Sequence, residues 1–244
     1  MRGDTEGLAL GSVQDQVAQG RWTIPDLALI AFAGLVGSIL GLGIGPGSEV
    51  IDALVGQFLL TAGAVALVGR TRQRDYRRLG FVVEGRDLTM LALGVGLQVA
   101  LAIVFLPMAR LVGLETEPQA LSGEVAAIGG LYSRMALFLL IGLIGPVLEE
   151  LMFRGILIDA LGARFQRRGV IFGSAAAFAA FHLVGISSVQ PLESAAVLVP
   201  QLFLFGVVLA HLRISRGRLG PAIFTHAGFN LLSLLVLVFY PELV

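Results

Sequence analysis

The sequence of 244 residues has no cysteine and no lysine, and only 14% of its residues carry a charge. The absence of cysteine excludes disulfide bonds, thiolate metal sites and cysteine nucleophiles. A soluble domain has about 25% charged residues, so the low fraction here indicates a protein of the lipid bilayer. The 17 arginines are balanced by 17 acidic residues, and this net charge of zero predicts no nucleic-acid partner.

What the sequence has in place of charge is a series of long apolar stretches. Hydrophobic residues make up 56% of the chain, and the mean hydropathy is +0.88. Seven stretches approach the roughly 20 residues that a transmembrane helix requires. They run over Leu27–Ile44, Ile51–Val68, Leu88–Val112, Leu131–Leu161, Val170–Ile186, Ser194–Leu212 and Leu219–Phe239. We therefore predict an all-α, polytopic integral membrane protein whose helices form a bundle.

The fourth stretch, Leu131–Leu161, is too long for one upright helix. We expect it to be tilted, kinked at Pro146 or broken into two pieces, which would raise the number of transmembrane helices from seven to eight. Along the chain we distinguish a polar N-terminal tail (1–23), three N-terminal transmembrane helices (24–130) and a C-terminal part (131–244) that carries every motif described below.

The distribution of arginine orients the predicted helices. Residues 70–86 carry six arginines, and 162–169 and 213–218 carry three each, whereas the alternate connections carry glutamates and almost no arginine. By the positive-inside rule, we expect the N-terminus and the arginine-rich loops in the cytosol and, with seven helices, the C-terminus outside. The expected location is therefore the plasma membrane, where the protein is multi-pass and in contact with lipids.

Near the middle of the fourth stretch, away from its ends, lie three charged side chains: Glu149, Glu150 and Arg154. Charges at membrane depth cost several kcal/mol each unless they are paired, so such residues are functional candidates. On a helix, Glu150 and Arg154 are four positions apart and share a face, which favours an ion pair. Glu149 is turned about 100° away from Glu150, and we expect its partner on another helix.

Other polar side chains are expected at the same depth on three helices. With a rise of about 1.5 Å per residue, Glu149, His182 and Asn230 lie roughly 16–18 Å from the cytosolic ends of their stretches. His226 lies one turn shallower, on the same helix face as Asn230, and His211 lies at the cytosolic end of its stretch. The convergence of Glu149, His182, His226 and Asn230 predicts a functional cluster.

The side chains of this cluster suit two kinds of chemistry. A carboxylate beside a histidine can remove a proton from a water molecule held between them. Imidazole and amide donors four residues apart, such as those of His226 and Asn230, can stabilise an oxyanion, and together these groups can hydrolyse a peptide bond. Two histidines and two glutamates are also a plausible zinc shell, although the sequence has no His-Glu-x-x-His helix and the histidines lie on different stretches.

Four motifs in order along the chain resemble those of the CAAX-processing and bacteriocin-processing family, the glutamate-type intramembrane endopeptidases related to the type II CAAX prenyl endopeptidase. The motifs are Glu149-Glu150-x-x-x-Arg154, Phe178-x-x-x-His182, Phe203-x-x-Gly206 and His226-x-x-x-Asn230. The resemblance covers about residues 134–240, and the first three stretches carry no motif. It implies a bundle of about eight helices around an intramembrane cavity that faces the cytosol.

The resemblance also implies a role for each motif residue. Glu149 corresponds to the general base that activates water together with His182. His226 and Asn230 correspond to the pair that stabilises the oxyanion. The supporting residues are Glu150 and Arg154, and the candidates for lining the substrate cavity are Phe178, Phe181 and Phe203.

The reading that we favour is an intramembrane endopeptidase that needs no metal or other cofactor. Its substrate would be a membrane-associated protein or peptide cleaved near a lipidated C-terminus, since prenylated C-terminal peptides are the substrates of the eukaryotic relatives. Three alternatives stay open: a non-catalytic immunity or scaffold protein of the same family, a metal-dependent membrane protease, and a transporter that uses Glu149, Glu150 and Arg154 as an ion relay.

Overall fold

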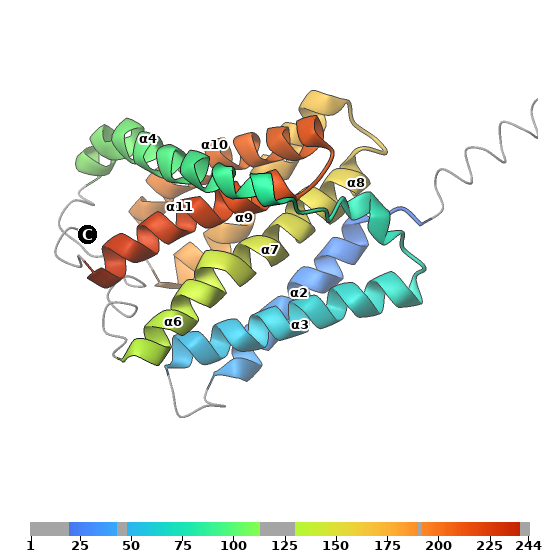
Figure 1. The fold of residues 1–244 in the computed structure, drawn as a ribbon, viewed down its shortest axis with the longest axis horizontal. Coiled ribbons are helices and arrows are strands. Elements are labelled where there is room, and N and C mark those ends of the chain that lie inside the picture. Colours follow the sequence, from blue (N-terminus) through green and yellow to red (C-terminus); the bar gives the residue numbers. More distant parts are fainter. Residues whose placement is uncertain (1–19, 43–47, 113–129, 190–191, 240–244) are drawn as a thin grey trace, which may run out of the picture.

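The structure, a computed structural model, describes residues 20–42, 48–112, 130–189 and 192–239. These residues are helical wherever they are regular, with no strand among them. Their long helices lie side by side in one bundle (Figure 1). The long helices are α2 (Ile24–Gly41), α3 (Glu49–Thr71), α4 (Met90–Leu111), a composite helix over Leu131–Leu161, α9 (Arg167–Val189), α10 (Leu192–Arg216) and α11 (Gly220–Phe239).

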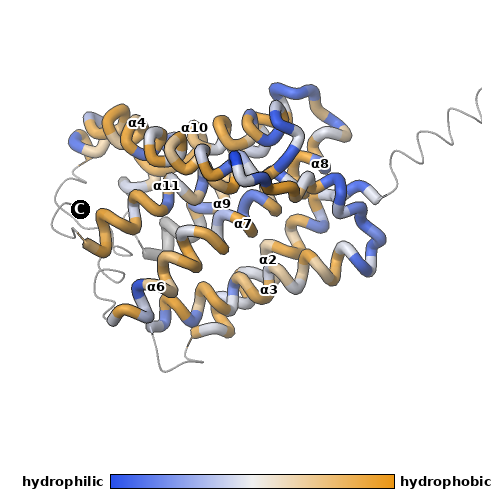
Figure 2. Tube along the Cα trace, viewed as in Figure 1, coloured by the Kyte–Doolittle hydropathy of each residue, from blue (hydrophilic) through white to orange (hydrophobic). Residues whose placement is uncertain are grey.

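Six of the helical segments are long and apolar enough to cross a membrane, and α9, with 23 residues, completes the bundle. Figure 2 shows hydrophobic residues along most of the length of these helices. Large apolar side chains such as Phe32, Leu59 and Ile103 are more than 60% exposed. A soluble protein does not expose so much apolar surface, whereas a bilayer covers it. The protein is therefore a polytopic membrane protein, as the sequence predicts.

The fourth predicted stretch is a single composite helix and is not broken into two. Regular α-helical turns alternate in it with two π-helical segments, in which a residue bonds the fifth residue along the chain. The order is α6 (Leu131–Leu139), π segment η3 (Leu140–Ile144), α7 (Gly145–Glu150), π segment η4 (Leu151–Leu157) and α8 (Ile158–Leu161). Pro146 stands in the first turn of α7, directly after η3, so the helix continues through the proline.

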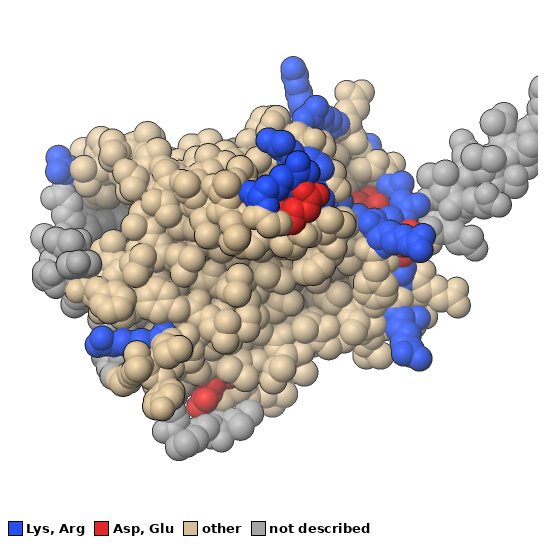
Figure 3. Space-filling view, in the orientation of Figure 1, with Lys and Arg blue, Asp and Glu red and all other residues tan. Residues whose placement is uncertain are grey.

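Most charged side chains gather at one end of the bundle, at the right of Figure 3. This end includes the short helices η1 (Tyr76–Leu79) and η2 (Gly85–Thr89), which join α3 to α4. The buried Asp26 at the start of α2 pairs there with Arg72 at 2.7 Å and Arg74 at 2.9 Å. The backbone N–H of Trp22 donates to Asp159 of α8, so the arginine-rich end ties the N-terminal helices to the composite helix.

Helices α2 and α3 form a tight pair because glycines let their backbones meet. A Cβ at Gly37 would collide with the backbone carbonyl of Gly56, and a Cβ at Gly34 would lie 2.5 Å from the hydroxyl of Thr61. Small residues allow this approach in membranes, where helices associate through close packing. The pair faces the composite helix across the cavity described below.

The polar N-terminal tail expected from the sequence falls mostly outside the described residues. Only residues 20–23 of the expected polar tail (1–23) are described. The side of the membrane on which each end lies, and the division at residue 130, stay predictions.

Candidate active site

The carboxylate of Glu150 is the fully buried centre of the polar cluster. Its Oε1 accepts a hydrogen bond from Nη1 of Arg154 at 2.9 Å, as the spacing on the helix predicts. The same oxygen lies 2.9 Å from Nδ1 of His226, which comes from α11. Because a carboxylate only accepts hydrogen bonds, Nδ1 of His226 carries the proton of this contact. Glu150 thus fixes the ring so that its Nε2 atom faces the other way.

The guanidinium of Arg154 has partners from two more helices. Nη2 donates to the backbone carbonyl of Gly206 in α10 at 3.3 Å, and the ring of Phe178 in α9 lies 4.3 Å from Cζ. A Cβ at Gly206 would lie 3.3 Å from Nη2 and 3.1 Å from Cα of Ala175. Glycine at this motif position therefore lets α10 approach both α9 and the arginine.

His182 is held in a matching way on α9. Its Nδ1 lies 2.9 Å from the backbone carbonyl of Phe178, one turn earlier in the same helix. A carbonyl can only accept, so this nitrogen donates and Nε2 is left for another partner. That Nε2 lies 3.5 Å from Oε2 of Glu149.

Glu149 completes the cluster, with its Oε2 between the two imidazoles. Nε2 of His226 lies 3.8 Å from this oxygen, and Nε2 of His182 lies 3.5 Å from it. The oxygen is buried, and no side chain or backbone group of the described residues donates a hydrogen bond to it. Three acceptor atoms thus converge on one point, and a water molecule placed there can donate its two O–H groups to two of them. Glu149 of α7, His182 of α9 and His226 of α11, all predicted from the sequence, therefore lie together in the structure.

A small cavity of about 20 Å³ lies beside Glu149, which is room for about one water molecule. Its walls come from α2, α3, α9 and the composite helix, and comprise Ala31, Gly34, Gln57, Phe58, Thr61, Leu148, Glu149, Met152 and Phe181. Gln57 and Thr61 were missed by the analysis of the sequence, because no family motif covers α3. The sequence did contain a signal for them: Gln57 and Thr61 are polar, lie four positions apart in an apolar stretch, and so share one face of the helix.

Asn230 binds the backbone of the composite helix, and this contact follows from the π segment η3. The N–H of Gly145, which would reach the carbonyl of Ile141 in an α-helix, bonds the carbonyl of Leu140. The next residue, Pro146, has no N–H to offer. The carbonyl of Ile141 thus lacks both of its possible helix partners, and Nδ2 of Asn230 donates to it at 3.0 Å. The predicted role of Asn230 at an oxyanion stays a prediction.

The second π segment, η4, has a similar partner from outside the helix. The hydroxyl of Ser174 in α9 donates to the carbonyl of Phe153 at 2.9 Å, and both groups are buried. Side chains from α11 and α9 therefore satisfy carbonyls in the two π segments on either side of Glu149 and Glu150. π segments occur frequently at functional sites because they alter which way the following side chains point.

The part of the chain that forms this cluster matches a known family. Residues 131–232 match the family model described as Type II CAAX prenyl endopeptidase Rce1-like. We call these residues the Rce1-like region, since they are similar to the CAAX-protease family. Neither a curated protein nor a solved structure matches the chain. The Rce1-like region starts with α6 and ends within α11, so it contains every motif residue, and the family supports protease activity in general.

The three phenylalanines expected to line the cavity of the Rce1-like region have different surroundings. Phe181 lines the cavity beside Glu149. Phe178 is completely buried, and its ring packs against Arg154 and His182, two members of the polar cluster. Phe203 stacks on Phe172 of α9, with ring centroids 6.3 Å apart. Neither Phe178 nor Phe203 is among the residues that line this small cavity, and their place in a substrate cavity stays a prediction.

A metal site was the alternative use of the same residue types. Within residues 20–42, 48–112, 130–189 and 192–239, no group of three or more His, Asp or Glu side chains is arranged to hold a metal ion. The two histidine Nδ1 atoms are already bonded to Glu150 and to a backbone carbonyl, and both histidines face Glu149 through Nε2.

Proposed function

We propose that the protein is an intramembrane endopeptidase that hydrolyses a peptide bond with water activated by Glu149 and His182. One observation carries the proposal: Nε2 of His182 and Nε2 of His226 converge on the buried, unbonded Oε2 of Glu149. The match of the Rce1-like region to an endopeptidase family also supports the proposal that the protein is a protease.

The reaction needs one water molecule at the point where the three acceptors meet. One O–H of the water donates to Oε2 of Glu149 and the other to Nε2 of His182. As the water oxygen attacks the scissile carbonyl carbon, Glu149 takes its proton as general base. The C–N bond then breaks, and the same proton passes from Glu149 to the leaving amine, so the carboxylate is regenerated.

The negative charge on the carbonyl oxygen requires hydrogen-bond donors in the transition state. We assign this role to His226 and Asn230. Glu150 holds Nδ1–H of His226 and Arg154 holds Glu150, so His226 would donate through Nε2 only when that nitrogen carries a proton as well. The amide of Asn230 would have to share its N–H between the substrate and the carbonyl of Ile141.

The proposed substrate is a membrane-associated protein or peptide, cleaved near a lipidated C-terminus of the kind that a prenyl endopeptidase accepts. A peptide bond inside a helix is shielded by its own backbone hydrogen bonds, so an extended tail suits this site better than an intact transmembrane helix. We propose that hydrolysis needs no metal and takes place in the plasma membrane.

The test compares purified wild-type protein with Glu149→Gln on native membranes, with new protein termini mapped by mass spectrometry. Glu49→Gln is the matched control, because Glu49 is exposed at the start of α3 and lies outside the cluster. We expect termini that appear with the wild type and the control and vanish with Glu149→Gln. Identical termini for all three proteins would refute the proposal and favour a binding or immunity role.

A further inference from the structure

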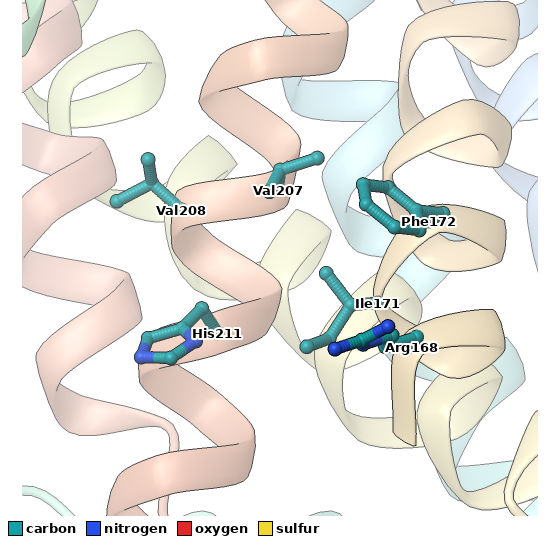
Figure 4. Close-up of a pocket in the computed structure, with 6 residues that line it drawn as sticks. All are labelled: Arg168, Ile171, Phe172, Val207, Val208 and His211. Carbon is teal, nitrogen blue, oxygen red and sulfur yellow. The ribbon is translucent and has the colours of Figure 1, made fainter. Parts of the chain in front are cut away.

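A second hollow lies outside the active site, between α9 and α10 on the outer face of the bundle. It is a groove of about 500 Å³, much larger than the cavity beside Glu149. Figure 4 shows its six lining residues, four of which are apolar and two of which are basic or imidazole side chains at one end. The lining residues are Ile171, Phe172, Val207, Val208, Arg168 and His211.

The polar end of the groove lies at the arginine-rich end of the bundle. Arg168 is in the first turn of α9, and His211 is near the end of α10, whose last turn carries Arg213 and Arg216. Both Arg168 and His211 are exposed, and neither forms an ion pair with an acidic group of the described residues. The positive-inside rule predicts that this end lies in the cytosolic headgroup layer.

The apolar part of the groove continues one helical turn deeper into the bilayer. Phe172 lies four residues beyond Arg168, and Val207 lies four residues before His211, so each is about 6 Å from the polar end along its helix. Phe172 is 51% exposed, and its ring stacks on Phe203 with an interplanar angle of 14°, which makes one wall flat. Such a surface suits the upper methylenes of an acyl chain.

We propose that this groove binds one anionic glycerophospholipid of the cytosolic leaflet. Its phosphate contacts the guanidinium of Arg168 and an imidazole N–H of His211, and one acyl chain lies over Phe172 and Val207. Charge complementarity selects the headgroup, because basic pockets between transmembrane helices on the cytosolic side bind anionic headgroups.

The groove is formed by the outer sides of α9 and α10, and both helices also carry residues that contact the active site. Phe178 and His182 stand on α9, and the carbonyl of Gly206, which binds Arg154, stands on α10 next to Val207. A lipid in the groove therefore touches the outer sides of helices whose inner sides position the cluster. The binding proposal does not depend on the proposed hydrolysis.

The experiment is native mass spectrometry of the full chain released from nanodiscs of phosphatidylcholine with a minor fraction of phosphatidylglycerol. We compare the wild type with the double variant Arg168→Gln/His211→Gln and with Val207→Trp, which fills the groove without changing a charge. Arg70→Gln, an exposed arginine of α3 at the same end of the bundle, is the charge control. Circular dichroism verifies that each variant folds.

The wild type should retain phosphatidylglycerol in preference to phosphatidylcholine, and the double variant should bind it about fivefold more weakly, since each interfacial arginine contributes about 1 kcal/mol. Val207→Trp should lose the lipid as well, and Arg70→Gln should keep it. Soluble glycerophosphate should not compete at the same concentration, because it has no acyl chain. Equal retention in the double variant, or an equal loss in Arg70→Gln, would overturn the proposal.

Discussion

The contact between Asn230 and the carbonyl of Ile141 predicts an energetic coupling between Asn230 and Pro146. The carbonyl depends on the amide of Asn230 because Gly145 bonds elsewhere and Pro146 has no N–H. Replacing Asn230 by leucine leaves the carbonyl without a donor. The contact of Asn230 with the Ile141 carbonyl is partly buried. An unsatisfied buried carbonyl costs about 1–3 kcal/mol in proteins, and hydrogen bonds within membranes average about 0.6 kcal/mol, so we expect a loss of about 1–2 kcal/mol.

The second variant, Pro146→Ala, supplies the missing N–H five residues after Ile141. In this background the carbonyl has a helix partner, and Asn230→Leu should cost less than about 0.5 kcal/mol. The two substitutions should therefore couple by about 1 kcal/mol in a double-mutant cycle, in the direction that makes the double variant more stable than the sum of the single effects.

The assay is equilibrium unfolding in mixed micelles of mild detergent and dodecyl sulfate, followed by circular dichroism and by the fluorescence of Trp22, the chain's one tryptophan. Thr225→Val serves as the control. Its hydroxyl donates to the carbonyl of Pro221 within α11, so its loss should be the same with proline or alanine at position 146. If Asn230→Leu and Pro146→Ala are additive, the account of the π segment is wrong.

Three further predictions concern the charges, the glycine motif and the cavity wall. Glu150→Ala should lower the free energy of unfolding by about 3–5 kcal/mol, because it leaves Arg154 buried without its carboxylate, and the double replacement of both residues by leucine should lose less when measured in the same micelles. Gly206→Ala should cost about 1–3 kcal/mol, since its Cβ would press on Ala175 and on the arginine, and thermal unfolding measures this. Gln57→Leu should raise KM several-fold with a smaller change in kcat if its amide binds the substrate backbone, and steady-state kinetics with a peptide substrate would separate the two.

The sequence is sufficient to predict the helical membrane bundle, because composition and stretch length decide it. Counting residues from the ends of the stretches brings Glu149, His182 and Asn230 to one depth and His226 one turn shallower, and the structure does bring Glu149, His182 and His226 together. The same holds for Glu150 and Arg154, whose spacing is local to one helix. Such predictions succeed where rise and spacing along a single helix are the only quantities needed.

The directions in which side chains point could not be predicted, because they depend on tertiary contacts. A regular helix assumed throughout the fourth stretch conceals the two π segments, which rotate the residues that follow them. Depth alone did not show that Asn230 reaches a backbone carbonyl or that Phe203 stacks on Phe172. The polar residues of α3 were missed because their relation to Glu149 exists only in the packed bundle.

The most direct test of the central claim is the cleavage of one identified substrate by purified protein in heavy-oxygen water with a metal chelator present. The account predicts that the wild type places one heavy oxygen in the new C-terminal carboxylate at an unchanged rate with chelator. It also predicts that Glu149→Gln lowers the rate by about 10²-fold or more, the range of a general base, while Glu49→Gln does not. Cleavage by Glu149→Gln at the wild-type rate, or its abolition by the chelator in the wild type, would contradict the account.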